Sequence, residues 1–303
     1  MHVIFLKRGE FLLNLRSIIN IKVRLSMQKR ILIVSQEISP YTEEGHLGQN
    51  VLDLAKIVKQ NKDAEVRLFM PKYGCVNERR HQLHEVIRLS GVNIVVNDID
   101  QPLIVKVASI PQARLQVYFI DNDEYFQRKV ITTEKDKSLV KDNDERMIFF
   151  CRGVLETLQM LGWSPDIIHC HGWFTSLLPL YLKEAISDDG VKLYSNHPVF
   201  KKTKILSSFQ KEGGFKGSLD KSLLEKLKFD GFKEDTISIL NRPNLENLSQ
   251  ISAKFSDGII LEDKYTNSNI LEVSYKDGIP VLNADDYDEY YNFYQNFFSE
   301  ELV

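Results

Sequence analysis

Two histidines one residue apart, His169 and His171, stand at the end of a short apolar run. Imidazoles move protons near neutral pH, and they also contact sugars or phosphates. Residues two apart on a strand face the same side, so both rings can line one pocket, whereas Cys170 faces the other side and makes a Cys–His nucleophile improbable. Structural hydrogen bonding is the alternative role. A metal site is disfavoured, because no other His, Cys or carboxylate cluster has metal-ligand spacing.

Asp142, Asn143 and Arg146 form a second group, at the start of a helical pattern over 144–161. Asp142 or Asn143 can cap that helix, because side-chain oxygens of these types accept hydrogen bonds from the free N–H groups of a first turn. Arg146 can hold a carboxylate or a ligand phosphate. Capping and ligand contact both stay open for this group.

The loop before the first helical pattern holds three candidates for ligand contact, Gly45, His46 and Gly48. Glycines at such a place let backbone amides approach a phosphate at a helix N-terminus. The neighbouring carboxylates of Glu43 and Glu44 repel a phosphate, so this loop alone is a weak signal.

Short apolar runs alternate with helical patterns, which is typical of an α/β fold with a doubly wound, mostly parallel Rossmann-like sheet and helices on both faces. The predicted strands cover 31–35, 65–70, 94–96, 104–108, 115–120, 166–170, 192–196 and 258–261. The predicted helices cover 51–58, 144–161 (ended by Gly162), 175–185, 218–227, 244–255 and 263–273. The strands between 94 and 120 are closely spaced and predict a small β insertion. His197, directly after the strand over 192–196, is a further candidate for substrate contact.

The chain has 303 residues, a formal net charge of −3 and a pI of about 6.2. A slightly acidic balance without a dense Lys/Arg block argues against an electrostatic nucleic-acid binder. No apolar stretch approaches the roughly 20 residues of a membrane-spanning helix. Cys75, Cys151 and Cys170 are far apart and form no CxxC motif, so we expect three small buried thiols in a reducing compartment and a cytoplasmic protein.

The two ends of the chain differ from its middle. Residues 1–26 mix apolar and basic side chains without a signal-peptide pattern, and we interpret them as an extension before a start at Met27. A weak amphipathic membrane helix or a targeting segment is the alternative. Over 284–303, aromatic residues recur at helical spacing, which predicts a helix that closes the domain over 27–283, with docking to a partner as the alternative. These residues are Tyr287, Tyr290, Tyr291, Tyr294, Phe297 and Phe298.

The order of these motifs resembles the N-terminal half of bacterial glycogen synthases and plant starch synthases, glycosyltransferase family 5. The most specific segment is similar to the family's W-x-P-D-(V/I)-(V/I)-H-x-H-D-W-x-T, and it reads Trp163-Ser-Pro-Asp-Ile-Ile-His-Cys-His-Gly-Trp-Phe-Thr175. Further matching segments are Ser39-Pro-Tyr41, Met70-Pro-Lys-Tyr-Gly74, Tyr118-Phe-Ile-Asp-Asn122 and Asp142-Asn143 with Arg146. The resemblance covers about residues 28–272.

Members of that family are retaining glycosyltransferases that use neither a metal nor another cofactor. They move glucose from ADP- or UDP-glucose to an α-1,4-glucan, in a cleft between two Rossmann-like domains. The resemblance therefore implies an α-glucan acceptor and a nucleotide-sugar donor as partners. On this basis the candidate catalytic residues are Asp142, His169 and His171, and the candidate substrate-binding residues are Gly45, His46, Gly48, Asn143, Arg146 and His197.

Three departures from the family pattern limit what the resemblance implies. Glu43 replaces the lysine of the family's K-T-G-G-L-G-D loop, which turns attraction for a phosphate into repulsion. Gly172 replaces the aspartate of H-x-H-D-W. The sequence also ends where the second domain is expected to begin, so we expect residues 1–303 to be inactive alone and to need a second polypeptide at the open face. The alternative is a non-catalytic homologue that binds glucan or a regulatory partner.

Overall fold

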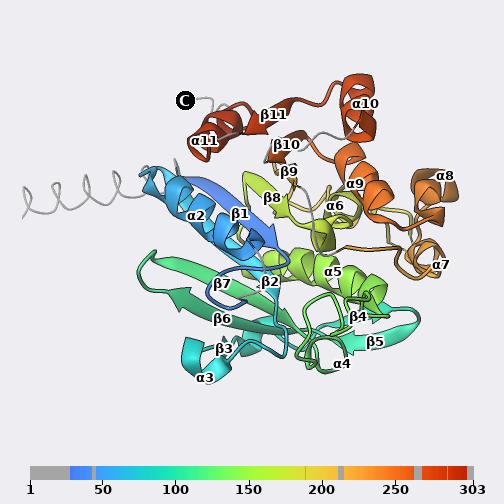
Figure 1. Ribbon diagram of the computed structural model, residues 1–303, viewed down its shortest axis with the longest axis horizontal. Helices are drawn as coiled ribbons and strands as arrows, with labels where there is room; N and C mark the ends of the chain where they lie inside the picture. The colour runs from blue at the N-terminus through green and yellow to red at the C-terminus, as the bar shows by residue number, and fades with distance from the viewer. Residues whose placement is uncertain are drawn as a thin grey trace, which may run out of the picture.

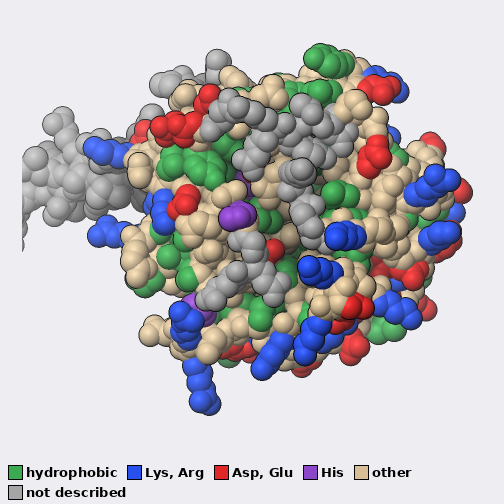
Figure 2. All heavy atoms as spheres, viewed as in Figure 1, with side chains coloured by type: hydrophobic (Ala, Val, Ile, Leu, Met, Phe, Trp, Pro, Cys, Tyr) green, Lys and Arg blue, Asp and Glu red, His purple; other side chains and the backbone are tan. Residues whose placement is uncertain are grey.

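The computed structural model describes residues 28–42, 46–187, 189–210, 215–262, 268–284 and 286–298. The predicted extension over 1–26 and the candidate Gly45 lie outside these described residues. Within the described ranges, no helix is long and apolar enough to cross a bilayer. Acidic and basic side chains lie interspersed on the face shown in Figure 2.

A nine-stranded sheet in the order β11-β10-β9-β8-β1-β2-β7-β6-β3 forms the centre of the molecule (Figure 1). The strands from β11 to β7 run parallel, while β6 and β3 join one edge antiparallel. Two further strands, β4 (Asn93–Val96) and β5 (Ile99–Pro102), form a separate hairpin. The sheet strands are β1 (Lys29–Ser35), β2 (Ala64–Pro71), β3 (His84–Glu85), β6 (Ile104–Ile110), β7 (Leu115–Asp121), β8 (Ile167–His171), β9 (Lys204–Phe209), β10 (Gly258–Glu262) and β11 (Val281–Ala284).

Helices cover both faces of this sheet (Figure 1). Helices α2 and α11 pack against each other on one face, and α5, α6 and α9 lie on the other, with α10 against α9. Central strands are therefore buried on both sides, and the four apolar residues from Ile31 to Val34 are all 0% exposed. The helices are α2 (Leu47–Gln60), α3 (Glu78–His81), α4 (Asp123–Phe126), α5 (Asn143–Leu161), α6 (Leu178–Glu184), α7 (Leu223–Phe229), α8 (Glu234–Ile237), α9 (Leu245–Lys254), α10 (Ser268–Asp277) and α11 (Asp288–Gln295), with short 3₁₀ turns over Ile87–Leu89, Trp173–Thr175 and Ser238–Asn241.

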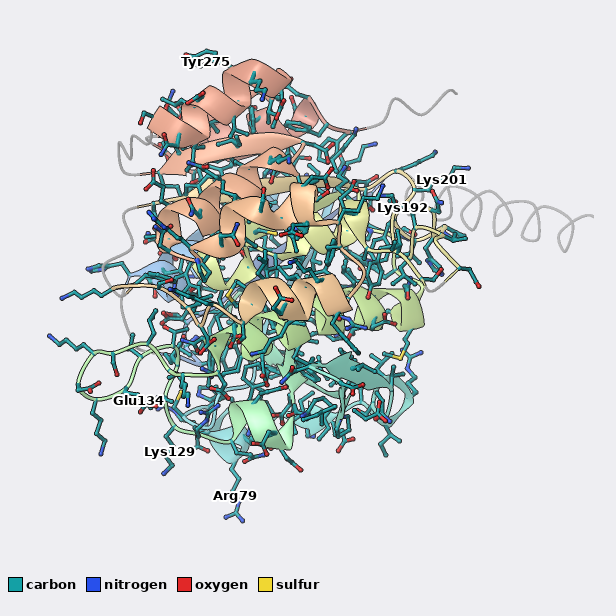
Figure 3. All side chains as sticks on the ribbon, turned by 90° about the vertical axis from the view of Figure 1, so that its right-hand side faces the viewer. Arg79, Lys129, Glu134, Lys192, Lys201 and Tyr275 are labelled. Carbon is teal, nitrogen blue, oxygen red and sulfur yellow. The ribbon has the colours of Figure 1, made fainter. Side chains whose placement is uncertain are left out.

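The predicted doubly wound, mostly parallel sheet is confirmed. The long helix is confirmed as α5, and Gly162 ends it in the left-handed conformation that glycine adopts without strain (φ 60°). The predicted aromatic helix is α11, which buries Tyr290, Phe293 and Tyr294 against the core. Tyr275 on α10, by contrast, lies at the outer surface (Figure 3).

Three expectations are wrong, and one strand was not predicted. Residues 192–196 form no strand, because after α6 the chain turns repeatedly before β9 begins at Lys204. Strand β9 itself was not predicted. The β insertion is smaller than expected, since β6 and β7 belong to the main sheet and only β4 and β5 stand apart. Cys75 is exposed, so only two of the three thiols are buried.

Candidate functional site

The histidine pair lies where the winding of the sheet changes direction. Strand β8 lies beside β1, on the side opposite β2, and His171 is its last residue. In doubly wound sheets, ligands bind outside the carboxyl ends of the strands at such a switch point. The position of His171 therefore matches that of a ligand-contacting residue.

The predicted orientation of the two rings is confirmed. His169 and His171 project to the face covered by α11, with the His171 Nε2 3.1 Å from the His169 Nδ1. Cys170 points to the opposite face, where it lies near Cys151 of α5. Among the described residues, no group of three or more His, Cys, Asp or Glu side chains is arranged to hold a metal ion.

His169 is fully satisfied by neighbouring side chains. Its Nε2 lies 2.8 Å from the Ser208 Oγ on β9, and its Nδ1 lies 2.7 Å from the Tyr294 hydroxyl on α11. The side chain is 0% exposed, and this burial lowers the pKa of His169 well below its usual value, with the nearby His171 acting in the same direction. His169 is therefore neutral near pH 7, and its contacts are those of a structural histidine.

His171 is paired with an acid that the sequence did not indicate. Its Nδ1 lies 3.5 Å from the Glu262 Oε1, at the end of β10. Burial raises the pKa of the Glu262 carboxyl, but hydrogen bonds from His171, Ser208 and Tyr290 and the charge of His171 bring it below its usual value.

Helix α11 seals the pair from its own side. Tyr294 bonds His169, and Tyr290 bonds Glu262, and both tyrosines are almost completely buried. As a result His169 is 0% and His171 only 2% exposed. A ligand can reach the His171 ring only if one of these neighbours moves.

Gly172 has a local reason to replace the family's aspartate. Its φ of +81° is the left-handed conformation that glycine tolerates best. A Cβ at this position would lie 2.8 Å from the Gln36 side chain, whose Oε1 accepts a hydrogen bond from the Phe174 N–H. Gln36 thus takes space beside His171 that a larger residue at position 172 would need.

Asp142 and Asn143 occupy the start of α5, but neither caps it through a side chain. Asp142 stands at the N-cap position without a side-chain capping bond, and it forms an ion pair with Arg128. The Asn143 amide donates instead to the Thr132 carbonyl, at 2.7 Å. The capping prediction is therefore wrong, and both residues tie α5 to the loop that precedes it.

Arg146 is buried between aromatic rings. It is 0% exposed, and its Nε donates to the Tyr125 carbonyl at 3.0 Å, while its Nη1 donates to the Asn143 Oδ1 at 2.7 Å. Burial lowers the pKa of Arg146. Its guanidinium lies over the rings of Tyr73, Phe126 and Phe174. The contact of Arg146 with a ligand stays a prediction. The contacts that Arg146 makes within the protein hold the start of α5 in place.

The remaining candidates lie apart from the histidines. His46 is exposed at the N-cap position of α2. Gly48 lets the start of α2 pack closely against the backbone of Ser39. Its carbonyl accepts a hydrogen bond from the Ser39 N–H at 3.0 Å, and a Cβ at position 48 would lie 3.1 Å from the same nitrogen. His197 precedes β9 and so lies at the amino edge of the sheet, opposite the edge that carries His171.

The structure thus groups the candidates into two clusters and adds residues to one of them. His169 and His171 are brought together with Glu262, Ser208 and two tyrosines of α11, none of which was predicted as a site residue. Asp142, Asn143 and Arg146 form the other cluster, held by partners around α4 and the following loop. The aromatic spacing in the sequence predicted α11, but it did not show that the tyrosines of this helix contact the histidine pair.

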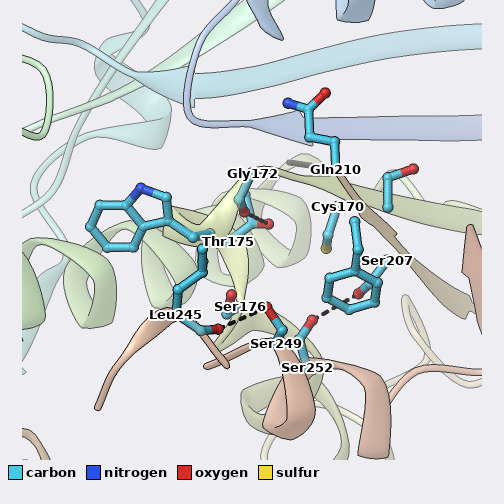
Figure 4. A pocket seen from close by; sticks show the side chains of 12 residues that line it. Cys170, Gly172, Thr175, Ser176, Ser207, Gln210, Leu245, Ser249 and Ser252 are labelled. Carbon is cyan, nitrogen blue, oxygen red and sulfur yellow. Dashed lines mark hydrogen bonds between the residues drawn. The ribbon is translucent and has the colours of Figure 1, made fainter. Parts of the chain in front are cut away.

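A second, serine-rich hollow lies on the opposite face of β8 and β9 (Figure 4). Ser207 on β9 lies 2.9 Å from the Ser252 hydroxyl and 2.8 Å from that of Ser256, and Cys170 lines the same space. The cavity volume is about 10 Å³, which is room for one water molecule. It is therefore too small to hold a sugar.

Comparisons with known proteins agree with the motifs. The profile of the starch synthase catalytic domain matches residues 30–282. A glycogen synthase of Chlorobium phaeobacteroides is 33% identical over 267 residues, which cover 85% of this chain and 53% of that protein. One from Chlorobium limicola is 43% identical over 155 residues, covering 51% of this chain and 32% of that protein.

Among solved structures, the fold resembles the catalytic domain of starch synthase IV from Arabidopsis thaliana bound to ADP and acarbose. The TM-score is 0.65 at 22% identity, over 87% of this chain and 53% of that one. The chain thus spans about half the length, or less, of the relatives it matches. With a family match over residues 30–282 and the same fold, this chain belongs to the family of starch synthase catalytic domains, the glycogen and starch synthase-like glycosyltransferases.

Proposed function

We propose that this chain acts in α-1,4-glucan metabolism as the acceptor-side half of a retaining glucosyltransferase that uses ADP- or UDP-glucose. The family match over residues 30–282 carries this proposal. The position of His171 at the carboxyl edge of the switch-point strand supports it. In this proposal Asp142 contacts the reacting sugar, and His171 does so once one of the neighbours that cover its ring moves. His169 supports the ring of His171.

We further propose that residues 1–303 do not transfer glucose without a donor-binding partner polypeptide. Both imidazoles are sealed by α11 and Glu262, so no open ring faces a substrate. Glu43 also brings a negative charge to the loop where the family carries a lysine. Transfer between two substrates needs positioning and charge stabilisation from both sides of a cleft.

The test measures incorporation of labelled glucose into glycogen by purified residues 1–303, from ADP-glucose and from UDP-glucose. We expect none from the chain alone. The second arm adds the separately purified C-terminal half of the Chlorobium phaeobacteroides glycogen synthase as the donor domain. Incorporation that appears only in this arm supports the proposal, whereas incorporation by residues 1–303 alone contradicts it.

A non-catalytic role is the second candidate, and the sealed histidine pair is the observation that favours it. In this case the chain binds glucan or a regulatory partner without transferring sugar. Co-sedimentation with glycogen separates the candidates, together with the donor-domain arm above. Retention on glycogen without incorporation in either arm supports the non-catalytic role. Absence of retention contradicts a glucan-binding role of either kind.

A further inference from the structure

A hollow of about 800 Å³ opens between the β4–β5 hairpin, α5, the end of α6 and the end of α7. Its volume falls in the range of small-molecule sites, about 300–1,000 Å³. The hollow lies against α5 and α6, which cover the face of the sheet opposite the histidine pair. None of the candidate site residues from the sequence lines it, so it is a separate feature.

A cation and an anion that line the hollow are paired with each other. The Arg152 Nη1 lies 3.3 Å from the Asp230 Oδ1, and it donates a hydrogen bond to the Val95 carbonyl at 2.6 Å. The Tyr181 hydroxyl donates to the other oxygen of Asp230. These contacts join α5 to β4 and α6 to the end of α7, so the elements around the hollow are held in fixed positions.

Asp98 stands at the turn of the β4–β5 hairpin and also lines the hollow. Asn97 and Asp98 have φ values of 53° and 61°, a turn conformation that these residue types tolerate. The turn is tied to α5, because the Asn97 side chain donates to the Glu145 Oε1 at 3.3 Å. Asp98 is exposed, and its carboxylate has no hydrogen bond or ion pair among the described residues. It therefore keeps an unmatched negative charge at the hollow.

Neighbouring bases do not balance this charge. Lys192 and Lys228 adjoin residues of the lining, but each already pairs with acids outside it. Arg152 is matched by Asp230, so the net charge of the lining is negative and comes from Asp98. A positively charged occupant complements this lining, whereas an anion is repelled.

Apolar side chains with exposed surface form the sides of the hollow. Phe229 is 55% exposed and Leu193 is 40% exposed, and Val95 and Ile186 are half-buried. An occupant with an apolar body would remove this surface from water, which favours binding roughly in proportion to the area covered. The face of the Phe229 ring can also attract a cation.

We propose that this hollow is a binding site for a low-molecular-weight organic amine with an apolar body. The ammonium group of the ligand lies against the Asp98 carboxylate, and its apolar part covers Phe229 and Leu193. Binding is non-covalent. The site is independent of the proposed role in glucan metabolism, whose candidate residues do not line the hollow.

Three indole probes of similar shape test the charge: at pH 7 tryptamine is a cation, tryptophol is neutral and indole-3-propionate is an anion. Isothermal titration and saturation-transfer NMR measure their binding to the full chain in about 0.15 M salt. We expect tryptamine to bind about threefold to fivefold more tightly than tryptophol, because one exposed charge contact contributes about that factor. The anion should bind more weakly than either. Equal affinities for the three probes, or binding of none of them at millimolar concentration, would overturn the proposal.

Asp98→Asn tests the carboxylate, with Asp100→Asn as the matched control. Asparagine also tolerates the left-handed conformation, so the turn should keep its shape. Asp98→Asn should weaken tryptamine binding about threefold to fivefold and leave tryptophol binding unchanged. Asp100 is exposed on the same hairpin but lies outside the lining, so its replacement should change either affinity by less than about twofold. Equal effects of the two variants would contradict a contact with Asp98.

Phe229→Ala tests the apolar side of the hollow, with Tyr275→Ala as its control. Loss of the Phe229 ring should weaken tryptamine and tryptophol alike, by about fivefold to tenfold, because both indoles lose the same apolar contact. Tyr275 is 83% exposed at the outer surface of α10, outside the lining, so its loss should change neither affinity (Figure 3). Circular dichroism checks the fold of each variant. Unchanged binding of both probes to folded Phe229→Ala would overturn the proposal.

Discussion

The Tyr294 hydroxyl lies 2.7 Å from the Nδ1 of His169, although the two residues are 125 positions apart in the sequence. Tyr294 belongs to α11, outside the segment matched by the family profile, and His169 belongs to the most specific family motif. The contact joins the C-terminal helix to the strand that carries the candidate site. The stability of α11 and the burial of the histidines therefore depend on each other.

Replacing Tyr294 by Phe should lower the free energy of unfolding by about 1–2 kcal/mol, because the buried His169 nitrogen loses a partner and the ring volume stays almost the same. Urea-induced unfolding measures this difference. Tyr291→Phe is the control: Tyr291 lies on the same helix and is half-buried, and its replacement should change stability by less than about 0.5 kcal/mol. Equal losses in the two variants would show that the hydrogen bond is not the cause.

Acid should destabilise the protein in a way that depends on His169. Burial holds the folded-state pKa of His169 well below its usual value of 6.5, so below pH 6.5 the unfolded chain binds a proton that the folded chain does not. Stability therefore falls as the pH decreases through this value, with a slope of up to about 1.4 kcal/mol per pH unit from this one group.

Unfolding free energies measured between pH 7.5 and 5 test this expectation, with His169→Gln as the variant. The variant should be less stable at pH 7.5 and should show a shallower decrease towards acid. Protonation of Glu262 should lower the stability further at lower pH. The folded-state pKa of Glu262 is lowered, so this carboxyl stabilises the fold only while it is ionised. A wild-type profile that is flat from pH 6.5 to 5 would contradict a neutral, buried His169.

The elements that the sequence predicted correctly are those whose buried positions carry apolar residues. Strand β8 begins with Ile167 and Ile168, and its two histidines follow at the spacing that places them on one face. Strand β9 was missed because its second half is Ser207, Ser208 and Phe209, which interrupts the apolar pattern. Those serines are buried because distant hydroxyls and an imidazole satisfy them, and such partners become visible only in three dimensions.

The run over 192–196 shows the opposite error. Leu193 and Tyr194 gave the run a short apolar pattern that favours a strand, but Tyr194 is instead buried with its hydroxyl 2.8 Å from the Glu156 Oε1 of α5. The prediction of the candidate site was limited for the same reason, because tertiary contacts bring some of its residues together. The family motif located His171, whereas Glu262 and Tyr290 come from elements far along the chain that only the sheet order brings to it. Propensity and motif order therefore locate strands and one side of a site, and tertiary contacts supply the rest.

Gly74→Ala should be among the more damaging single-methyl changes in this chain. A Cβ at Gly74 would lie 2.0 Å from the carbonyl oxygen of Gln127, and its own N–H donates to the Arg128 carbonyl at 2.9 Å. Neither backbone can move freely, so we expect a loss of about 2–3 kcal/mol in unfolding free energy, as for other overpacked sites.

Gly48→Ala gives the graded comparison, since its Cβ would meet the Ser39 nitrogen at 3.1 Å, a smaller overlap. Its loss should be about 1 kcal/mol or less, after allowing for the helix preference of alanine. Thermal and urea unfolding rank the two variants. A Gly48 variant less stable than the Gly74 variant would contradict the packing described for the segment that carries Arg128.

Arg146→Lys separates a role in packing from a role in ligand contact. Lysine keeps the charge but cannot reach both the Tyr125 carbonyl and the Asn143 side chain, so buried acceptors lose partners and the unfolding free energy should fall by about 2–4 kcal/mol. Arg128→Lys is the control, because Arg128 is partly exposed and its ion pair with Asp142 is worth about 1 kcal/mol or less. Because Arg146 is 0% exposed, glycogen co-sedimentation should fall only in proportion to the unfolded fraction. A fully folded Arg146→Lys variant that no longer co-sediments would instead assign Arg146 a direct contact with glucan.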